Sequence, residues 1–187
     1  MFTLTEADLR GEQPYYRLRD TKDGRGVIIE GVGRLPASVD DVFSVLTDFE
    51  NFKEWMPTVV RSDVVAREGQ LVRVQVRHTV PLVGTFDCRS KYRIQENGPA
   101  KVLDGQVTFC IVDRSQTRYC VEPAADGRAA LVRYFQSCDL GQWLPLFVMR
   151  WMVRREYRSA ATALGARVEV VQRKARLGTS RAASEAP

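Results

Sequence analysis

The only histidine in this chain, His78, is the side chain best suited to moving a proton near neutral pH. It stands in the alternating stretch 71–80, where it shares one strand face with valines that include Val74 and Val76. We therefore expect His78 to project inward, as a general base or as a hydrogen-bond donor to a ligand carbonyl. The alternative is a histidine at the edge of the core, near the turn at Pro81, that bonds to backbone.

Several other polar side chains could share that interior. Strand alternation aims five of them inward, namely Ser90, Tyr92, Tyr119, Tyr134 and Gln136. A mostly apolar pocket with a few such groups suits an amphipathic or aromatic ligand, although the tyrosines could instead place their hydroxyls at the sheet margin. No Ser/His/Asp or Cys/His pairing is visible, so the usual hydrolytic machinery is absent. The remaining candidates for ligand contact are Trp55, Val74, Val76, Phe86, Cys88, Met149, Val153 and Tyr157.

The four cysteines do not form a metal-binding pattern. Cys88, Cys110, Cys120 and Cys138 lie far apart, each inside a strand-like run, with no CxxC pair and a single histidine to join them. We expect four small buried thiols in a reducing compartment, and neither a metal nor a cofactor.

Composition indicates one globular domain. The chain has 187 residues, of which 44% are hydrophobic and 27% charged, and its net charge of +5 is spread evenly. The absence of a Lys/Arg run argues against nucleic acid as a partner. No signal peptide and no apolar run of about 20 residues is visible, so we expect a cytoplasmic protein.

The first part of the chain predicts a strand followed by two short helices. Residues 1–26 are polar and are expected to cover a sheet edge or to remain loosely ordered. A strand over 26–34 contains glycines at 31 and 33, which indicate a bend or a close backbone approach. Ser38 is a good N-cap for a helix, and a second short helix ends at Pro57.

After Pro57 the pattern alternates with a period of two for about 80 residues. It predicts six strands in succession, over 58–67, 71–80, 85–94, 101–112, 116–122 and 130–140. Together with the first strand, these make a seven-stranded antiparallel sheet that needs a cover over its apolar face.

The long helix predicted over 144–171 is large enough to provide that cover. Its apolar residues recur at spacings of three and four, so one stripe can lie on the sheet and leave a ligand space between them. Residues 172–187 are expected to be a disordered tail. The front of the helix region, 143–152, is more apolar than a cover requires, and we expect ligand entry and membrane contact there.

The outer face of this helix carries aromatic and basic side chains, which suits contact with a membrane surface. The candidates for this peripheral contact are Phe147, Arg150, Trp151 and Arg154, and Glu156 is read as a minor offset to the charge of this face. The alternative is a solvated basic face whose aromatics pack on neighbouring loops or on a second subunit. The oligomeric state stays open.

The stretch 35–57 resembles the START / polyketide cyclase / Coq10-like (SRPBCC) superfamily. The matching features are the acidic pair that opens the helix, then Val42-Phe43, and then Asp48, Phe52, Trp55 and Pro57. The resemblance covers about 27–171, the expected ligand-binding domain. It implies an α+β helix-grip fold, in which a curved sheet wraps round the C-terminal helix over a deep apolar cavity.

Two functions remain open. The first is a non-catalytic binding or carrier protein for a hydrophobic small molecule, such as a lipid, a quinone or a polyketide-like compound. The alternative is an aromatase/cyclase-type enzyme, in which His78 or a tyrosine moves protons in the same cavity. A third reading is a dimeric module whose exposed aromatics form a protein interface.

Overall fold

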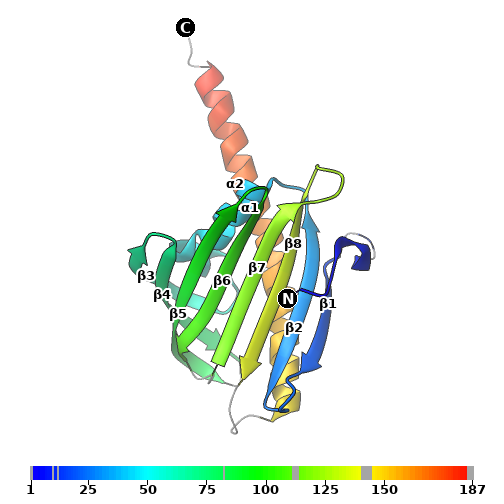
Figure 1. Ribbon diagram of the computed structural model, residues 1–187. Helices are drawn as coiled ribbons and strands as arrows, with labels where there is room; N and C mark the ends of the chain where they lie inside the picture. The colour runs from blue at the N-terminus through cyan, green and yellow to red at the C-terminus, as the bar shows by residue number, and fades with distance from the viewer. Residues whose placement is uncertain are drawn as a thin grey trace.

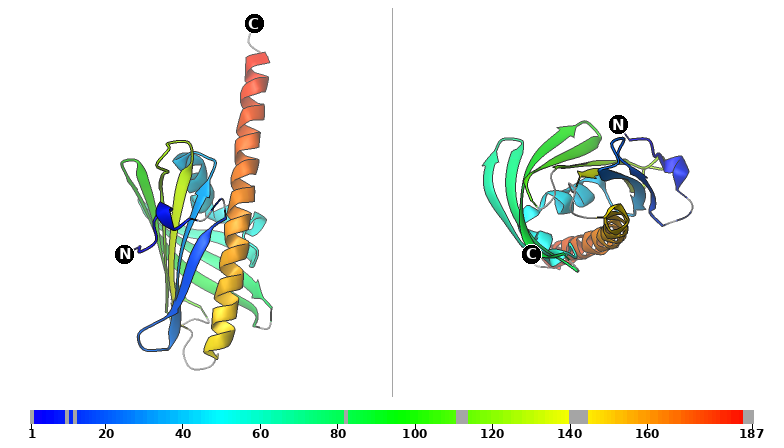
Figure 2. Two further views of the ribbon diagram at one scale, coloured as in Figure 1. Left: turned by 90° about the vertical axis from the view of Figure 1, so that its right-hand side faces the viewer. Right: turned by 90° about the horizontal axis from the view of Figure 1, so that it is seen from below.

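The computed structural model describes residues 2–9, 11, 13–81, 83–110, 114–139 and 145–184. Within these ranges, one antiparallel sheet of eight strands curves around a long C-terminal helix, α2 (Leu146–Ser184) (Figures 1 and 2). The strands are β1 (Tyr15–Asp20), β2 (Gly26–Leu35), β3 (Val59–Glu68), β4 (Leu71–Val80), β5 (Gly84–Asn97), β6 (Ala100–Phe109), β7 (Arg114–Pro123) and β8 (Ala130–Asp139). The shorter helices are η1 (Glu6–Asp8), α1 (Val39–Thr47) and η2 (Phe49–Glu54).

The sheet order is β1-β2-β8-β7-β6-β5-β4-β3. Strands β3 to β8 therefore follow one another as a meander, and β2 joins the sheet beside β8. The chain between β2 and β3 must cross from one side of the sheet to the other, and α1 and η2 make that crossing (Figure 1). This is the α+β helix-grip architecture that the sequence predicted.

The predicted number of strands was one too low, because β1 lies inside the polar segment 1–26. Strand β1 pairs with β2 from Tyr15↔Val32 to Asp20↔Val27 at the edge of the sheet. Its side chains are half-buried or exposed, so the sequence Tyr-Tyr-Arg-Leu-Arg-Asp carries little apolar alternation. Edge strands commonly have this composition, since one of their sides faces water.

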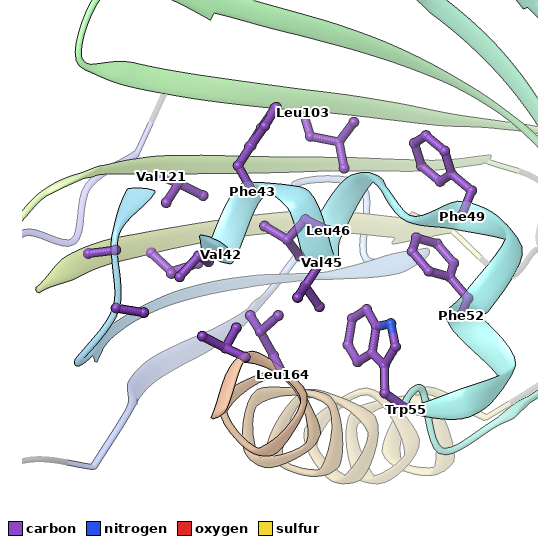
Figure 3. Packing of buried hydrophobic residues seen from close by; sticks show 14 of the residues in the cluster. Val42, Phe43, Val45, Leu46, Phe49, Phe52, Trp55, Leu103, Val121 and Leu164 are labelled. Atoms are coloured by element: carbon purple, nitrogen blue, oxygen red, sulfur yellow. The ribbon is translucent and has the colours of Figure 1, made fainter. Parts of the chain in front are cut away.

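Helix α1 begins where the sequence indicated. The Ser38 hydroxyl accepts a hydrogen bond from the Asp41 backbone N–H at 3.0 Å, which is the expected N-cap. The helix then buries Val42, Phe43 and Leu46 against the sheet, and η2 adds aromatic rings to the same cluster (Figure 3). These short helices close one end of the space under α2.

Helix α2 is longer than predicted. It contains 39 residues and continues to Ser184, whereas the expected helix ended at 171 and was followed by a disordered tail. Its last turns extend past the sheet (Figure 2). Residues 172–184 contain three Arg, three Ala, one Lys and one Gln, all good helix formers, and no proline. Positions 143 and 144, the predicted start of the apolar front and of the helix, lie outside the described residues.

The two ends of α2 pack against different clusters. Leu164 and Val168 are buried in the main core with α1, while Met149 is buried with Val27 and Cys138 nearer the start of the helix. Between these two clusters, residues of α2 such as Met152 and Ala160 line a hollow between the helix and the sheet. That arrangement forms the cavity described below.

The cysteines differ from the expectation of four free thiols. A disulfide joins Cys88 on β5 to Cys110 just after β6, whereas Cys120 and Cys138 are free and buried. This pairing was not predicted, because Cys88 and Cys110 are 22 positions apart and the strand register was not known.

Candidate functional site

A cavity of about 920 Å³ lies between the sheet and α2. Its walls come from β2, α1, η2 and the residues after it, strands β4 to β8, and the inner face of α2. The apolar part includes Leu46, Phe52, Met56, Val80, Leu103, Val107, Val132, Met152, Ala160 and Leu164. This is the space that the sequence predicted between sheet and helix.

Most of the side chains predicted to contact a ligand line this cavity. They are Trp55, Val76, His78, Cys88, Ser90, Tyr92, Tyr119, Tyr134, Gln136 and Tyr157. They converge because β4, β5, β7 and β8 alternate as expected, so that charged neighbours such as Arg77, Lys91 and Arg118 lie on the outer face.

Four predicted contact residues do not line the cavity. Val74 is fully buried in the main core, and Met149 packs with Val153 in the smaller cluster near the start of α2. Phe86 stacks on His78 with ring centroids 5.7 Å apart. Val74, Met149 and Val153 therefore belong to the packed core and not to the cavity wall.

His78 faces the cavity and does not depend on backbone for its hydrogen bond. Its Nδ1 lies 3.2 Å from the Thr58 hydroxyl oxygen. Burial lowers the pKa of His78 to about 4, so the imidazole is neutral at pH 7. It can therefore offer a neutral nitrogen to a ligand.

A cluster of phenols occupies the wall formed by β7, β8 and α2. The Tyr134 ring lies 4.8 Å from that of Tyr119 and 5.5 Å from that of Tyr157, centroid to centroid. The Tyr134 hydroxyl donates to Gln136 Oε1 at 2.6 Å, and Gln136 Nε2 donates to Ser115 Oγ at 3.5 Å. Burial raises the pKa of all three phenols, for Tyr157 to about 12, so they remain protonated.

Gly31 on β2 makes room for one of these rings. A Cβ atom at Gly31 would overlap the phenol of Tyr157. The close backbone approach indicated by this glycine is thus the contact between β2 and α2 that holds Tyr157 against the sheet.

The structure adds one side chain that the sequence reading placed wrongly. Glu156 was assigned to the outer, basic face of the helix, yet it lines the cavity. Its Oε1 is buried and has no hydrogen-bond partner among the described residues. Burial raises the pKa of Glu156, and a hydrogen bond with Thr58 partly opposes that rise. Helical spacing could have located it, because Glu156 precedes the inward residue Ala160 by four positions.

The predicted membrane-contact residues are on the outer face near the start of α2. Phe147 is 73% exposed and Trp151 46% exposed. Arg154 is exposed, while Arg150 forms an ion pair with Asp20 on β1. Trp151 also lines the cavity, so it stands at the rim.

The part of the chain that the structure describes contains neither a metal-binding cluster nor a membrane-spanning helix. No group of three or more His, Cys, Asp or Glu side chains there is arranged to hold a metal ion. No helix there is both long enough and apolar enough to cross a membrane.

The fold is shared with proteins of known structure. A STAR-related lipid transfer protein from Xanthomonas axonopodis superimposes with a TM-score of 0.75 at 19% identity, covering 86% of this chain and 96% of that chain. Human StAR-related lipid transfer protein 5 gives 0.74 at 12% identity, with 88% and 86% covered. The ZhuI aromatase/cyclase from Streptomyces sp. R1128 gives 0.64 at 12% identity, with 83% and 94% covered.

The family is defined by sequence as well as by fold. Residues 27–169 match the family model described as polyketide cyclase / dehydrase and lipid transport. Because this match spans most of the chain, the protein belongs to that family, and the superfamily resemblance inferred from 35–57 is confirmed. Among curated proteins, none matches the sequence.

Proposed function

We propose that this protein binds a hydrophobic small molecule in the cavity under α2 and carries it without covalent chemistry. The observation that supports this most strongly is a hollow of about 920 Å³ whose wall is mainly apolar. That volume is at the upper end of the range typical of small-molecule pockets. Burial of an apolar ligand stabilises the complex by about 25 cal/mol per Å² before ordering costs. The ligand classes that fit are a lipid, a quinone or a polyketide-like compound.

The polar groups in the wall suit orientation of a ligand better than chemistry. The phenols stay protonated at neutral pH, and His78 is hydrogen-bonded to Thr58 with no cysteine or serine nucleophile beside it among the described contacts. A few fixed hydrogen-bonding groups in an apolar wall are the usual means of orienting a bound molecule.

A substitution that fills the cavity tests the proposal. Val76→Phe adds a ring to the cavity wall, whereas Val65→Phe adds the same ring at a position on β3 that is 63% exposed. With 12-(1-pyrenyl)dodecanol as a fluorescent probe, Val76→Phe should weaken binding at least tenfold and Val65→Phe should leave it unchanged. Equal binding by both variants would place the probe elsewhere and refute the proposal.

An aromatase/cyclase-type activity is the second candidate, and the position of His78 favours it. The neutral imidazole faces the cavity, where it is able to accept a proton from a bound chain. The variant His78→Ala separates the two functions. Unchanged ligand affinity with loss of turnover on a polyketide-like substrate would establish the enzyme, while unchanged affinity with no turnover in either protein would support the carrier.

We also propose that the front of α2 contacts membrane surfaces. Phe147 and Trp151 are exposed there, and Arg155 lies over the Trp151 ring at 5.5 Å. Aromatic rings beside guanidinium groups suit the headgroup region of an anionic bilayer. A carrier that loads from a membrane needs such a contact beside its cavity rim.

A further inference from the structure

Two residues that line the cavity each carry a buried polar atom with no hydrogen-bond partner among the described residues. One is a donor, the indole Nε1–H of Trp55, and the other is an acceptor, Oε1 of Glu156. A buried polar group without a partner costs about 1–3 kcal/mol. Groups of this kind are uncommon in native proteins, and a bound ligand is one way to satisfy them.

Glu156 is the one charged residue of the described cavity wall that is not exposed. The others, Arg34, Arg155 and Glu169, lie in exposed positions. Burial chiefly raises the pKa of Tyr119 and Tyr134, and the negative charge of Glu156 adds to this. The carboxyl therefore lies close enough to β7 and β8 to act across the hollow. The Tyr134 hydroxyl is already committed to Gln136 and does not serve Glu156.

Trp55 reaches the same part of the cavity from the opposite element. It follows η2, and its ring packs edge-on to Phe52 at 5.6 Å. Figure 3 shows the indole over α2, beside Phe52. Thr58, three residues further along the chain, is the residue that hydrogen-bonds with Glu156. Thr58 therefore links the chain segment that carries Trp55 to Glu156 on α2.

We propose that Trp55 and Glu156 form a specificity subsite for a neutral ligand that carries a hydroxyl group. The hydroxyl donates to Glu156 Oε1, and an oxygen of the same polar end accepts from Trp55 Nε1. This inference rests on the proposed binding function and adds the chemical class of the ligand: an alcohol or phenol on an otherwise apolar body.

The same subsite selects against anions. A ligand carboxylate or phosphate placed there would face the Glu156 carboxylate in a water-poor space, where repulsion between like charges is strong. No cation in the described cavity wall is buried beside Glu156 to offset it. Fatty acids and phospholipids with their headgroups inside are therefore disfavoured relative to neutral hydroxylated molecules.

Three probes with one apolar body and different ends test the subsite. They are 12-(1-pyrenyl)dodecanol, 12-(1-pyrenyl)dodecanoate and 1-dodecylpyrene, each titrated into the full-length protein at pH 8. We expect the alcohol to bind about tenfold more tightly than the carboxylate, and about fivefold more tightly than the hydrocarbon, since a hydrogen bond contributes about 1 kcal/mol.

Two substitutions at position 156 separate charge from hydrogen bonding. Glu156→Gln keeps an acceptor oxygen and removes the charge. It should therefore retain binding of the alcohol, while the affinity for the carboxylate probe should rise about tenfold. Glu156→Leu removes both, so the alcohol should lose its advantage over the hydrocarbon. Trp55→Phe keeps a ring and removes the donor, and it should weaken binding of the alcohol several-fold more than binding of the hydrocarbon.

The failures are distinguishable. If the wild-type protein binds all three probes equally, or if neither substitution at 156 changes their order, the subsite is refuted while the binding function stands. If no probe binds the wild-type protein, the binding function fails and the subsite falls with it. If Glu156→Leu does not fold, Glu156→Gln still tests the subsite, because it alone should change the affinity for the carboxylate probe.

Discussion

Burial shifts the pKa values of two titratable side chains of the cavity, His78 and Glu156, in opposite directions. Burial lowers the pKa of the imidazole to about 4 and raises that of the carboxyl, and in both cases it favours the uncharged form. Thr58 contacts both groups, so it links them at one side of the cavity.

His78 should make the folded protein sensitive to mild acid. Its pKa is lower in the folded state than the ordinary value of 6.5, so its contribution to stability is complete above pH 6.5 and is lost as the pH falls toward 4. At about 1.4 kcal/mol per pH unit, this interval corresponds to up to about 3 kcal/mol. The variant His78→Gln should lack this loss. Urea denaturation at pH 7 and pH 4.5 measures it, and equal pH dependence in both proteins would contradict the assignment.

Glu156 should behave in the opposite sense. Its pKa is raised on folding, so the folded protein is favoured at low pH and the cost of the carboxyl grows as the pH rises through its folded pKa. Replacement by Leu removes a buried oxygen that has no described partner. We expect Glu156→Leu to raise the free energy of unfolding by about 1–2 kcal/mol at pH 8, and by less at pH 4. Lower stability of the variant at pH 8 would argue that Glu156 has a structural partner.

At the scale of elements, the site depends on how α2 lies against β2. Gly31 provides the gap that the Tyr157 ring fills. We expect Gly31→Ala to destabilise the protein by about 1–3 kcal/mol, because the added methyl group overlaps that ring. The added substitution Tyr157→Leu should restore part of the loss.

Gly33→Ala is the matched control for this change. It lies on the same strand, and its Cβ would meet only Pro14 at 3.4 Å, an ordinary contact. Thermal or urea denaturation of the three variants measures the difference. Equal losses at both glycines would mean that strand propensity, and not the packing of α2, determines the cost.

The outer face of α2 has its own prediction. If the exposed aromatic residues enter a bilayer, Phe147→Ala and Trp151→Ala should each weaken sedimentation with vesicles that contain phosphatidylglycerol, by several-fold. Leu177→Ala is the control, since Leu177 is 66% exposed on the same helix far from the cavity. Unchanged sedimentation of both aromatic variants, or concentration-dependent dimerisation that they abolish, would assign the face to another partner.

For the whole molecule, the sequence was sufficient to predict the curved sheet, the long helix over it and the hollow between them. That prediction rested on the strong alternation in 71–80 and on the N-cap at Ser38, because both features depend only on residues close together in the sequence. It failed for β1, whose edge position depends on tertiary pairing, and for the Cys88–Cys110 disulfide, which depends on strand register.

The candidate site was predictable only in part for the same reason. Strand parity located inward side chains such as Tyr134 and Gln136, since a strand has only two faces. It could not say where the core ends and the hollow begins, so Val74 was included and Thr58 was missed. Glu156 was missed because an acidic residue among arginines was assigned to the solvent side.

Native mass spectrometry tests the central claim most directly, namely that the cavity under α2 holds a hydrophobic small molecule. The wild-type protein and Val76→Phe would each be incubated with the total lipid extract of the cells that produce them, then transferred intact to the gas phase. We predict one bound molecule per wild-type chain and none on Val76→Phe, because the added ring occupies the hollow. A wild-type protein that stays empty, or one that shares the same bound masses with Val76→Phe, would contradict it.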